Sequence, residues 1–122
     1  MSQPVAALLP NLDERPSASH LAALFRGLAE PARLSILRRL VDDGPQTVSE
    51  LAVACRQRQP SVSKHLACLH GCGLAARERR GRRIFYSALV PEVPSLLAAA
   101  ERLWEITRCG ESCACPCCQE RR

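Results

Sequence analysis

Hydrophobic residues recur at helical spacing in five stretches of the chain. The first stretch runs from Ser17 to about Glu30, and the second begins at Pro31, where a proline suits the first position of a helix. Thr47-Val-Ser-Glu50 has the pattern of a capping box, so a third helix is expected to begin there. The repeating apolar positions of the first, amphipathic helix are Leu21, Leu24, Phe25 and Leu28. The expected core faces are Leu34, Leu37, Leu40 and Val41 in the second helix and Val48, Leu51, Ala52 and Cys55 in the third.

A fourth helix is predicted from Pro60 to about Gly73, after a short polar link, Arg56 to Gln59. Val62, Leu66 and Leu69 give it an apolar stripe at i, i+4 and i+7. Two short helices joined by such a turn are typical of a helix-turn-helix, in which the second helix contacts the bases. The row about a quarter-turn from the stripe contains Ser61, His65, Cys68 and Cys72, with Lys64 at its edge.

The next segment predicts a β-hairpin. Leu74 to Arg79 and Arg83 to Leu89 are expected to be strands, since the second is rich in β-forming residues, and Arg80-Gly81-Arg82 is the expected turn. A hairpin directly after a helix-turn-helix indicates a wing. Its arginines suit phosphates or the minor groove.

A last helix is predicted from about Pro94, and its apolar stripe bears on how two copies of the chain would pair. The stripe contains Leu96, Leu97, Ala100, Leu103 and Trp104. Pairing with the first helix across a dimer twofold is the favoured interpretation, and ordinary core packing is the alternative. The predicted fold is therefore mainly α with a small β-hairpin: a winged helix-turn-helix of four helices, two strands and a last helix. Residues 1–16 form a flexible arm, 17–108 a DNA-binding and dimerisation domain, and 109–122 a Cys-rich tail.

Charge and cysteine content narrow the function. The net charge is +5, but the segment from Arg56 to Arg83 alone holds eight Arg or Lys against Glu78, which makes it +7 and leaves −1 on each side. Such a block favours a polyanionic partner, with a solvated basic face as the alternative. Neither a signal peptide nor a long apolar run is evident, so a cytoplasmic protein without a membrane partner is expected. Eight cysteines then indicate metal or redox chemistry more than disulfides.

Three motifs resemble a known family. With Leu28-Ala-Glu-Pro-Ala-Arg-Leu34, Pro60-Ser-Val-Ser-Lys-His-Leu66 and Gly73-Leu74 at their places, residues 18–107 resemble the ArsR/SmtB family of metal-responsive winged-helix repressors. The resemblance implies a homodimer that binds operator sequences in double-stranded DNA, is released when an ion binds, and is not an enzyme. The expected DNA-binding residues are Gln59, Ser61, Ser63, Lys64 and His65 on the fourth helix and Arg79, Arg80, Arg82 and Arg83 on the hairpin.

Several ion sites of this family have no counterpart in the sequence. Ala52 and Ala54 stand where the arsenic and cadmium site presents cysteines, and no histidine follows His70, as the terminal-helix zinc and nickel sites would require. An N-terminal cysteine site is missing too, because the first cysteine is Cys55. Cys68 and Cys72 remain as the candidate thiolate ligands.

Cys68 and Cys72 lie at i and i+4, about 5–6 Å apart at Cβ, so both sulfurs can bind one soft ion. They resemble the mycobacterial cadmium- and lead-sensing branch, which completes the site from the C-terminal tail; counted from Tyr86, its tail ligand falls on Cys113. Cd(II) or Pb(II) is the expected effector, followed by Hg(II) or As(III), with Zn(II) binding in vitro. A redox sensor that acts through tail disulfides is the alternative. The alternative ligands are Cys109, Cys115, Cys117, Cys118 and His65.

Overall fold

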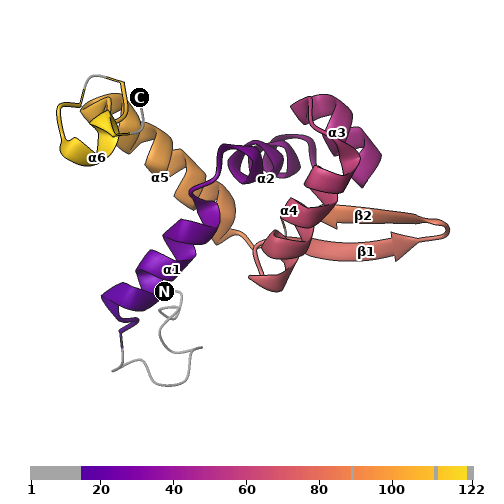
Figure 1. Ribbon diagram of the computed structural model, residues 1–122. Coiled ribbons are helices and arrows are strands. Elements are labelled where there is room, and N and C mark those ends of the chain that lie inside the picture. Colours follow the sequence, from indigo (N-terminus) through magenta and orange to yellow (C-terminus); the bar gives the residue numbers. More distant parts are fainter. Residues whose placement is uncertain (1–14, 89, 112, 121–122) are drawn as a thin grey trace.

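The protein folds into helices followed by a hairpin and a long last helix, as its computed structural model shows (Figure 1). The structure describes residues 15–88, 90–111 and 113–120, so most of the predicted N-terminal arm, 1–16, and Leu89 lie outside it. Its elements confirm the predicted winged helix-turn-helix, and α6 is a short addition within the tail. They are α1 (Ala18–Leu28), α2 (Pro31–Asp43), α3 (Val48–Cys55), α4 (Gln59–Gly71), β1 (Ala76–Arg80), β2 (Arg83–Ser87), α5 (Glu92–Thr107) and α6 (Pro116–Gln119).

The helix starts show why these segments fold locally. Ser17 and His20 form a reciprocal capping box on α1, in which the Ser17 hydroxyl accepts from the His20 backbone N–H and the His20 ring accepts from that of Ser17. On α3 the Thr47 hydroxyl accepts from the Glu50 backbone, as predicted. The Glu50 carboxylate departs from the predicted box: it accepts from the Thr47 hydroxyl and pairs with Arg83.

The main core lies between α2, α3, α4 and the hairpin, and it sets the rotation of α4. The predicted stripe of Val62, Leu66 and Leu69 is fully buried, and each such side chain contributes about 1.5–3 kcal/mol through burial. Leu51 and Ala52 on α3 are buried against it, with Cys55 partly buried at its edge. Because this face of α4 points inward, the row of polar side chains and thiols must face outward.

Part of the predicted core is exposed. On α2 the structure buries Ile36 completely, whereas Leu34 is 36% exposed, so the prediction of Leu34 as a core residue was wrong. On α1, which was predicted to pair with the last helix across a dimer twofold, only Leu28 is buried, and Phe25 is 54% exposed. Figure 1 shows α1 and α5 leaving the body on the side away from the hairpin, and nothing in the described chain covers most of their stripes.

The hairpin is shorter and tighter than predicted. Arg80 pairs with Arg83, so the loop is only Gly81-Arg82, and Gly81 has the positive φ that a two-residue hairpin loop favours. The first strand begins at Ala76, because the N–H groups of Leu74 and Ala75 bond to the Leu69 carbonyl at the end of α4.

Two helix boundaries also differ from the prediction. The helix α4 ends at Gly71, which places Cys72 at its C-cap. The helix α5 begins at Glu92, two residues before Pro94.

Candidate DNA interface and thiol clusters

The outward face of α4 carries the predicted DNA-binding side chains. Gln59, Ser61, Ser63 and Lys64 are exposed and His65 is half-buried. The helix α3 packs against α4, and the Arg56 that joins them adopts a left-handed conformation at the end of α3. The first turns of α4 therefore expose polar and basic side chains, as base contacts from a recognition helix require.

The four predicted wing arginines differ in the contacts that their side chains make. Arg80 pairs with Glu78 at 3.2 Å, Arg83 pairs with Glu50 at 2.8 Å, and Arg79 donates to the Gly81 carbonyl. Both Arg80 and Arg83 also lie over the Phe85 ring. Within the described residues, Arg82 at the loop makes no ion pair or hydrogen bond. Arg82 is therefore the wing arginine whose charge is most available to a phosphate.

Contacts that the sequence analysis did not anticipate hold the wing beside the helix-turn-helix. Gln46 and Tyr86 exchange two backbone hydrogen bonds, of 2.9 and 2.8 Å, just before α3 begins. The Arg83–Glu50 pair adds a side-chain link to α3. At the other end of the hairpin, the His70 ring bonds to the Ala75 carbonyl at 3.2 Å. The sequence placed Glu50 in a capping box and Arg83 and Tyr86 in the second strand, but no local pattern indicated these contacts.

Cys68 and Cys72 are exposed one helical turn apart. The Cys72 N–H donates to the Cys68 carbonyl at 3.0 Å, and its helical backbone continues the turn of α4 by one residue. Both thiols lie on the recognition helix, C-terminal to the predicted base contacts. Across the part of the chain that the structure describes, no third Cys, His or carboxylate joins them in a ligand cluster.

The tail cysteines instead gather at the far end of α5. The sulfurs of Cys109, Cys113 and Cys118 lie within 4.8 Å of one another, and so do those of Cys115, Cys117 and Cys118. Figure 1 places this tail and α6 at the opposite end of α5 from α4 and the hairpin. Within one chain, the structure thus brings the predicted tail ligands to each other and not to the α4 thiols.

Crowding and burial perturb two of the thiols. A hydrogen bond with Cys115, together with the charges of Cys115 and Cys118, raises the pKa of Cys117 to about 11. Burial raises the pKa of Cys55, and the nearby Arg39 guanidinium lowers it by a smaller amount. The raised pKa favours the neutral thiol of Cys55, which lies partly buried against the core face where it was predicted.

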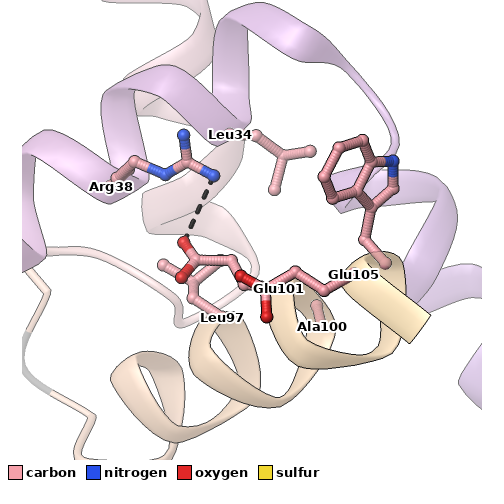
Figure 2. Close-up of a pocket in the computed structure, with 7 residues that line it drawn as sticks. Leu34, Arg38, Leu97, Ala100, Glu101 and Glu105 are labelled. Carbon is pink, nitrogen blue, oxygen red and sulfur yellow. Dashed lines mark ion pairs between the residues drawn. The ribbon is translucent and has the colours of Figure 1, made fainter. Parts of the chain in front are cut away.

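An open groove of about 670 Å³ lies between α2 and α5. Figure 2 shows Arg38 of α2 directed toward Glu101 of α5, an ion pair of 3.3 Å, with Leu34 and Leu97 beside it. Further along α5, Leu103 is 62% and Ile106 81% exposed. A small protein rarely leaves so much apolar surface uncovered unless it binds a partner.

A helix-turn-helix with a protruding basic face and an arginine-rich wing defines a winged-helix DNA-binding protein. Residues 30–77 match the bacterial regulatory protein, arsR family, and the chain belongs to this family. This is a family of transcriptional regulators and not of enzymes. Among the described residues, no helix has the length and hydrophobicity to cross a membrane.

Similar proteins are known from several bacteria. The chain is 38% identical to a probable mercury resistance operon repressor of Streptomyces lividans, over 67% of this chain and 65% of that protein, slightly under two thirds of its length. It is 37% identical to the arsenical resistance operon repressor of Escherichia coli, over 72% and 73% of the two chains. It is 42% identical to the HTH-type transcriptional regulator CmtR of Mycobacterium tuberculosis, over 57% and 58%.

Solved structures share the fold. The crystal structure of Rv0081 from M. tuberculosis superposes with a TM-score of 0.68 and 31% identity, over 75% of this chain and 92% of that one. A homodimeric winged helix-turn-helix DNA-binding domain from Mycobacterium bovis, solved by NMR, has a TM-score of 0.60 and 26% identity, over 75% and 91%.

Proposed function

We propose that the protein is a homodimeric repressor that leaves its operator when a thiophilic ion binds Cys68 and Cys72. The observation that carries the proposal is that both thiols are exposed on the helix whose outward face presents the DNA-binding side chains. Any ion that ties this helix to another segment acts on the DNA-reading element itself. A long coupling path between the two sites is then unnecessary.

The DNA interface combines α4 with the wing. Ser61, Ser63, Lys64 and His65 contact base edges and phosphates, while the wing arginines bind the backbone of the duplex. Two such units related by a twofold axis place the recognition helices in successive major grooves, about one helical turn apart, on a partly palindromic operator.

The exposed stripes of α1 and α5 support the homodimer. Phe25 on α1 and Leu103 and Ile106 on α5 are apolar and largely exposed, and a second copy would bury them. The M. bovis neighbour with this fold is a homodimer. A twofold arrangement also brings the tail of one subunit near the partner, since the tail continues directly from α5.

A tail cysteine completes the ion site, and Cys113 is the residue that the family resemblance indicates. Because the tail of a single chain lies at the other end of α5, the ligand comes from the partner subunit or from a tail that has moved. All-thiolate ligation favours soft ions over magnesium or calcium. Cd(II) and Pb(II) are the first candidates, and the mercury and arsenical repressors among the relatives make Hg(II) and As(III) the next.

The free energy that must couple ion binding to release of the operator is modest for a thiolate site. A shift from mostly bound to mostly free operator needs a difference in ion affinity between the two states equivalent to about 5.5 kcal/mol, summed over both subunits. Two thiolates on each recognition helix supply strong ion bonds that depend directly on the helix position.

The test is a mobility-shift assay on the operator with Cys68→Ser and Cys72→Ser proteins. Both variants should bind DNA as the unmodified protein does but remain bound when Cd(II) is added. Cys55→Ser is the matched control, since Cys55 lies apart from the α4 row, and it should respond normally. Release of a Cys68→Ser/Cys72→Ser protein by the ion would disprove the site.

Thiol oxidation is a second candidate effector, because the Cys109 and Cys118 sulfurs lie 3.4 Å apart and those of Cys115 and Cys117 lie 3.1 Å apart. A redox repressor would leave the operator on mild oxidation and return on reduction. An ion sensor kept reduced should instead respond to Cd(II) alone.

A further inference from the structure

We infer that the tail forms an ion site of its own, centred on the Cys118 thiolate with Cys115 and Cys117, and separate from the Cys68–Cys72 pair. The sulfurs of these three residues lie within 4.8 Å of one another. Cys109 is the fourth ligand, since its sulfur lies 3.4 Å from that of Cys118. Each chain then holds two soft ions, one on the recognition helix and one at the end of α5.

The local fold brings Cys109, Cys115 and Cys117 close to Cys118. Arg108 ends α5 in a left-handed conformation and Gly110 has a φ of +88°, so the chain reverses direction directly after Cys109. The short helix α6 then presents Cys117 and Cys118 beside Cys115, and the N–H of Cys118 bonds to the Cys115 carbonyl at 3.1 Å. The Cys118 sulfur therefore lies near Cys109 on one side and near Cys115 and Cys117 on the other, without any contribution from α4.

The tail cluster is anchored to α5 by contacts beside the sulfurs. The Trp104 indole N–H donates to the Cys109 carbonyl at 3.1 Å, and Arg108 lies over the same indole ring at 4.4 Å. Arg108 also pairs with Glu111 at 2.7 Å. These contacts hold the start of the tail against the helix, so that ion binding need not order the whole segment.

The donor set selects the class of ion. Four sulfurs and no carboxylate favour a soft ion such as Cd(II) or Zn(II) over hard oxygen-seeking cations. Each thiol that becomes a ligand loses its proton to solvent as its sulfur–metal bond forms, and no sulfur changes oxidation state. Binding is therefore complete under reducing conditions and needs no oxidant.

Cys113 is not a ligand of this tail site, so it remains available to bind the ion at Cys68 and Cys72. Cys113 belongs to the other tail group, with Cys109 and Cys118, and its sulfur accepts from the Cys115 backbone N–H. The tail ion uses Cys115, Cys117 and Cys118 with Cys109, so the two sites do not compete for one ligand. The inference goes beyond the proposed release mechanism and does not depend on it.

The experiment uses the full chain carrying Cys68→Ser and Cys72→Ser, reduced, and titrates it with Cd(II). Thiolate-to-cadmium absorption should rise and reach a plateau at about one ion per chain. The fluorescence of Trp104, the chain's single tryptophan, should change over the same range because of its bond to Cys109. A titration without saturation would overturn the tail site.

Two further variants in the same background test the ligand set. Adding Cys118→Ser should abolish saturable binding, because Cys118 is the central sulfur. Adding Cys113→Ser, a matched change in the same tail, should leave it intact. Equal loss in both would show that the tail binds through a different set of sulfurs and refute the assignment.

Operator release separates this inference from the proposed function. A protein with only Cys118→Ser should still leave the operator on adding Cd(II), although it binds one ion fewer per chain. If the Cys68→Ser/Cys72→Ser protein binds one ion and is also released by it, the tail site stands and the proposed release mechanism fails.

Discussion

The wing arginines offer a quantitative test of the DNA interface, because Arg82 is the one of the four predicted wing arginines whose side chain lacks an intramolecular partner among the described residues. We expect Arg82→Ala to weaken operator binding without changing the free energy of unfolding. In a homodimer the substitution removes two positive charges, one from each wing. If each neutralises one phosphate, the slope of log K against log salt concentration becomes shallower by about 1.8.

That slope sets the expected size of the effect. A change of about 1.8 in slope means that, between 50 and 200 mM salt, the affinity of the unmodified protein falls about tenfold more than that of the variant. The two proteins should therefore differ most at low salt and converge as salt rises. Fluorescence anisotropy with a labelled operator at four or more salt concentrations measures both slopes directly.

Comparing Arg83→Ala with Arg82→Ala separates the loss of a charge from the loss of an ion pair. It removes the same charge and also breaks the 2.8 Å pair with Glu50, whose partners are both well exposed. An exposed pair contributes about 0.2–1 kcal/mol, so this variant, unlike Arg82→Ala, should lower the unfolding free energy slightly in urea denaturation. Arg39→Ala, on α2 and paired with Asp43, is the control for loss of charge. An unchanged salt slope in Arg82→Ala would refute the assignment of this residue to a phosphate.

Two further predictions concern the dimer and the buried thiol. Leu103→Glu should convert the dimer to monomers in sedimentation experiments without unfolding it, since Leu103 is exposed in the isolated chain. Val53→Glu, at a still more exposed site on α3, should leave the dimer intact. Because burial raises the pKa of Cys55, the Cys55 thiol of the native protein should alkylate more slowly than exposed Cys68 at pH 8, and the Cys55 rate should rise as pH increases. Equal alkylation rates of the two cysteines, measured by mass spectrometry, would contradict the burial argument.

The helix-turn-helix could be predicted from sequence because its signals are local. Pro31, the Thr47 cap and the Val62–Leu66–Leu69 stripe each determine where a helix begins or which face it buries, and the structure confirms all three. Such signals depend only on neighbours within a few residues along the chain.

The sequence could not show whether Leu34 or Ile36 would be buried, and the reason is physical. Helical spacing indicates that α2 has an apolar side, but Ile36–Leu37–Leu40 and Leu34–Leu37–Val41 both satisfy it. Ile36 and Leu40 are buried with α3 and α4, Leu37 is buried with Leu28 and Val93, and Leu34 faces the groove beside α5. Only the packing of helices that are distant in sequence separates the two.

The sequence also could not predict which cysteines of the tail lie together. Its cysteines have no helical or strand period, so spacing alone could not show which sulfurs meet. Their grouping follows from the reversal at Arg108 and Gly110 and from α6, a turn too short to produce a sequence signal. The wing pair of Arg83 and Glu50 was missed similarly, since it joins residues 33 positions apart.

The placement of the tail on α5 connects ion response to assembly. In one chain the tail sulfurs cluster at the end of α5 away from α4, and the same helix carries the exposed stripe of the proposed dimer. A tail ligand that reaches Cys68 and Cys72 across the twofold therefore depends on the dimer, whereas the Cys118-centred site is complete within one chain. The monomeric Leu103→Glu protein should accordingly retain the tail ion and bind the α4 ion more weakly. Equal affinity of the α4 site in monomer and dimer would show that its third ligand comes from the same subunit.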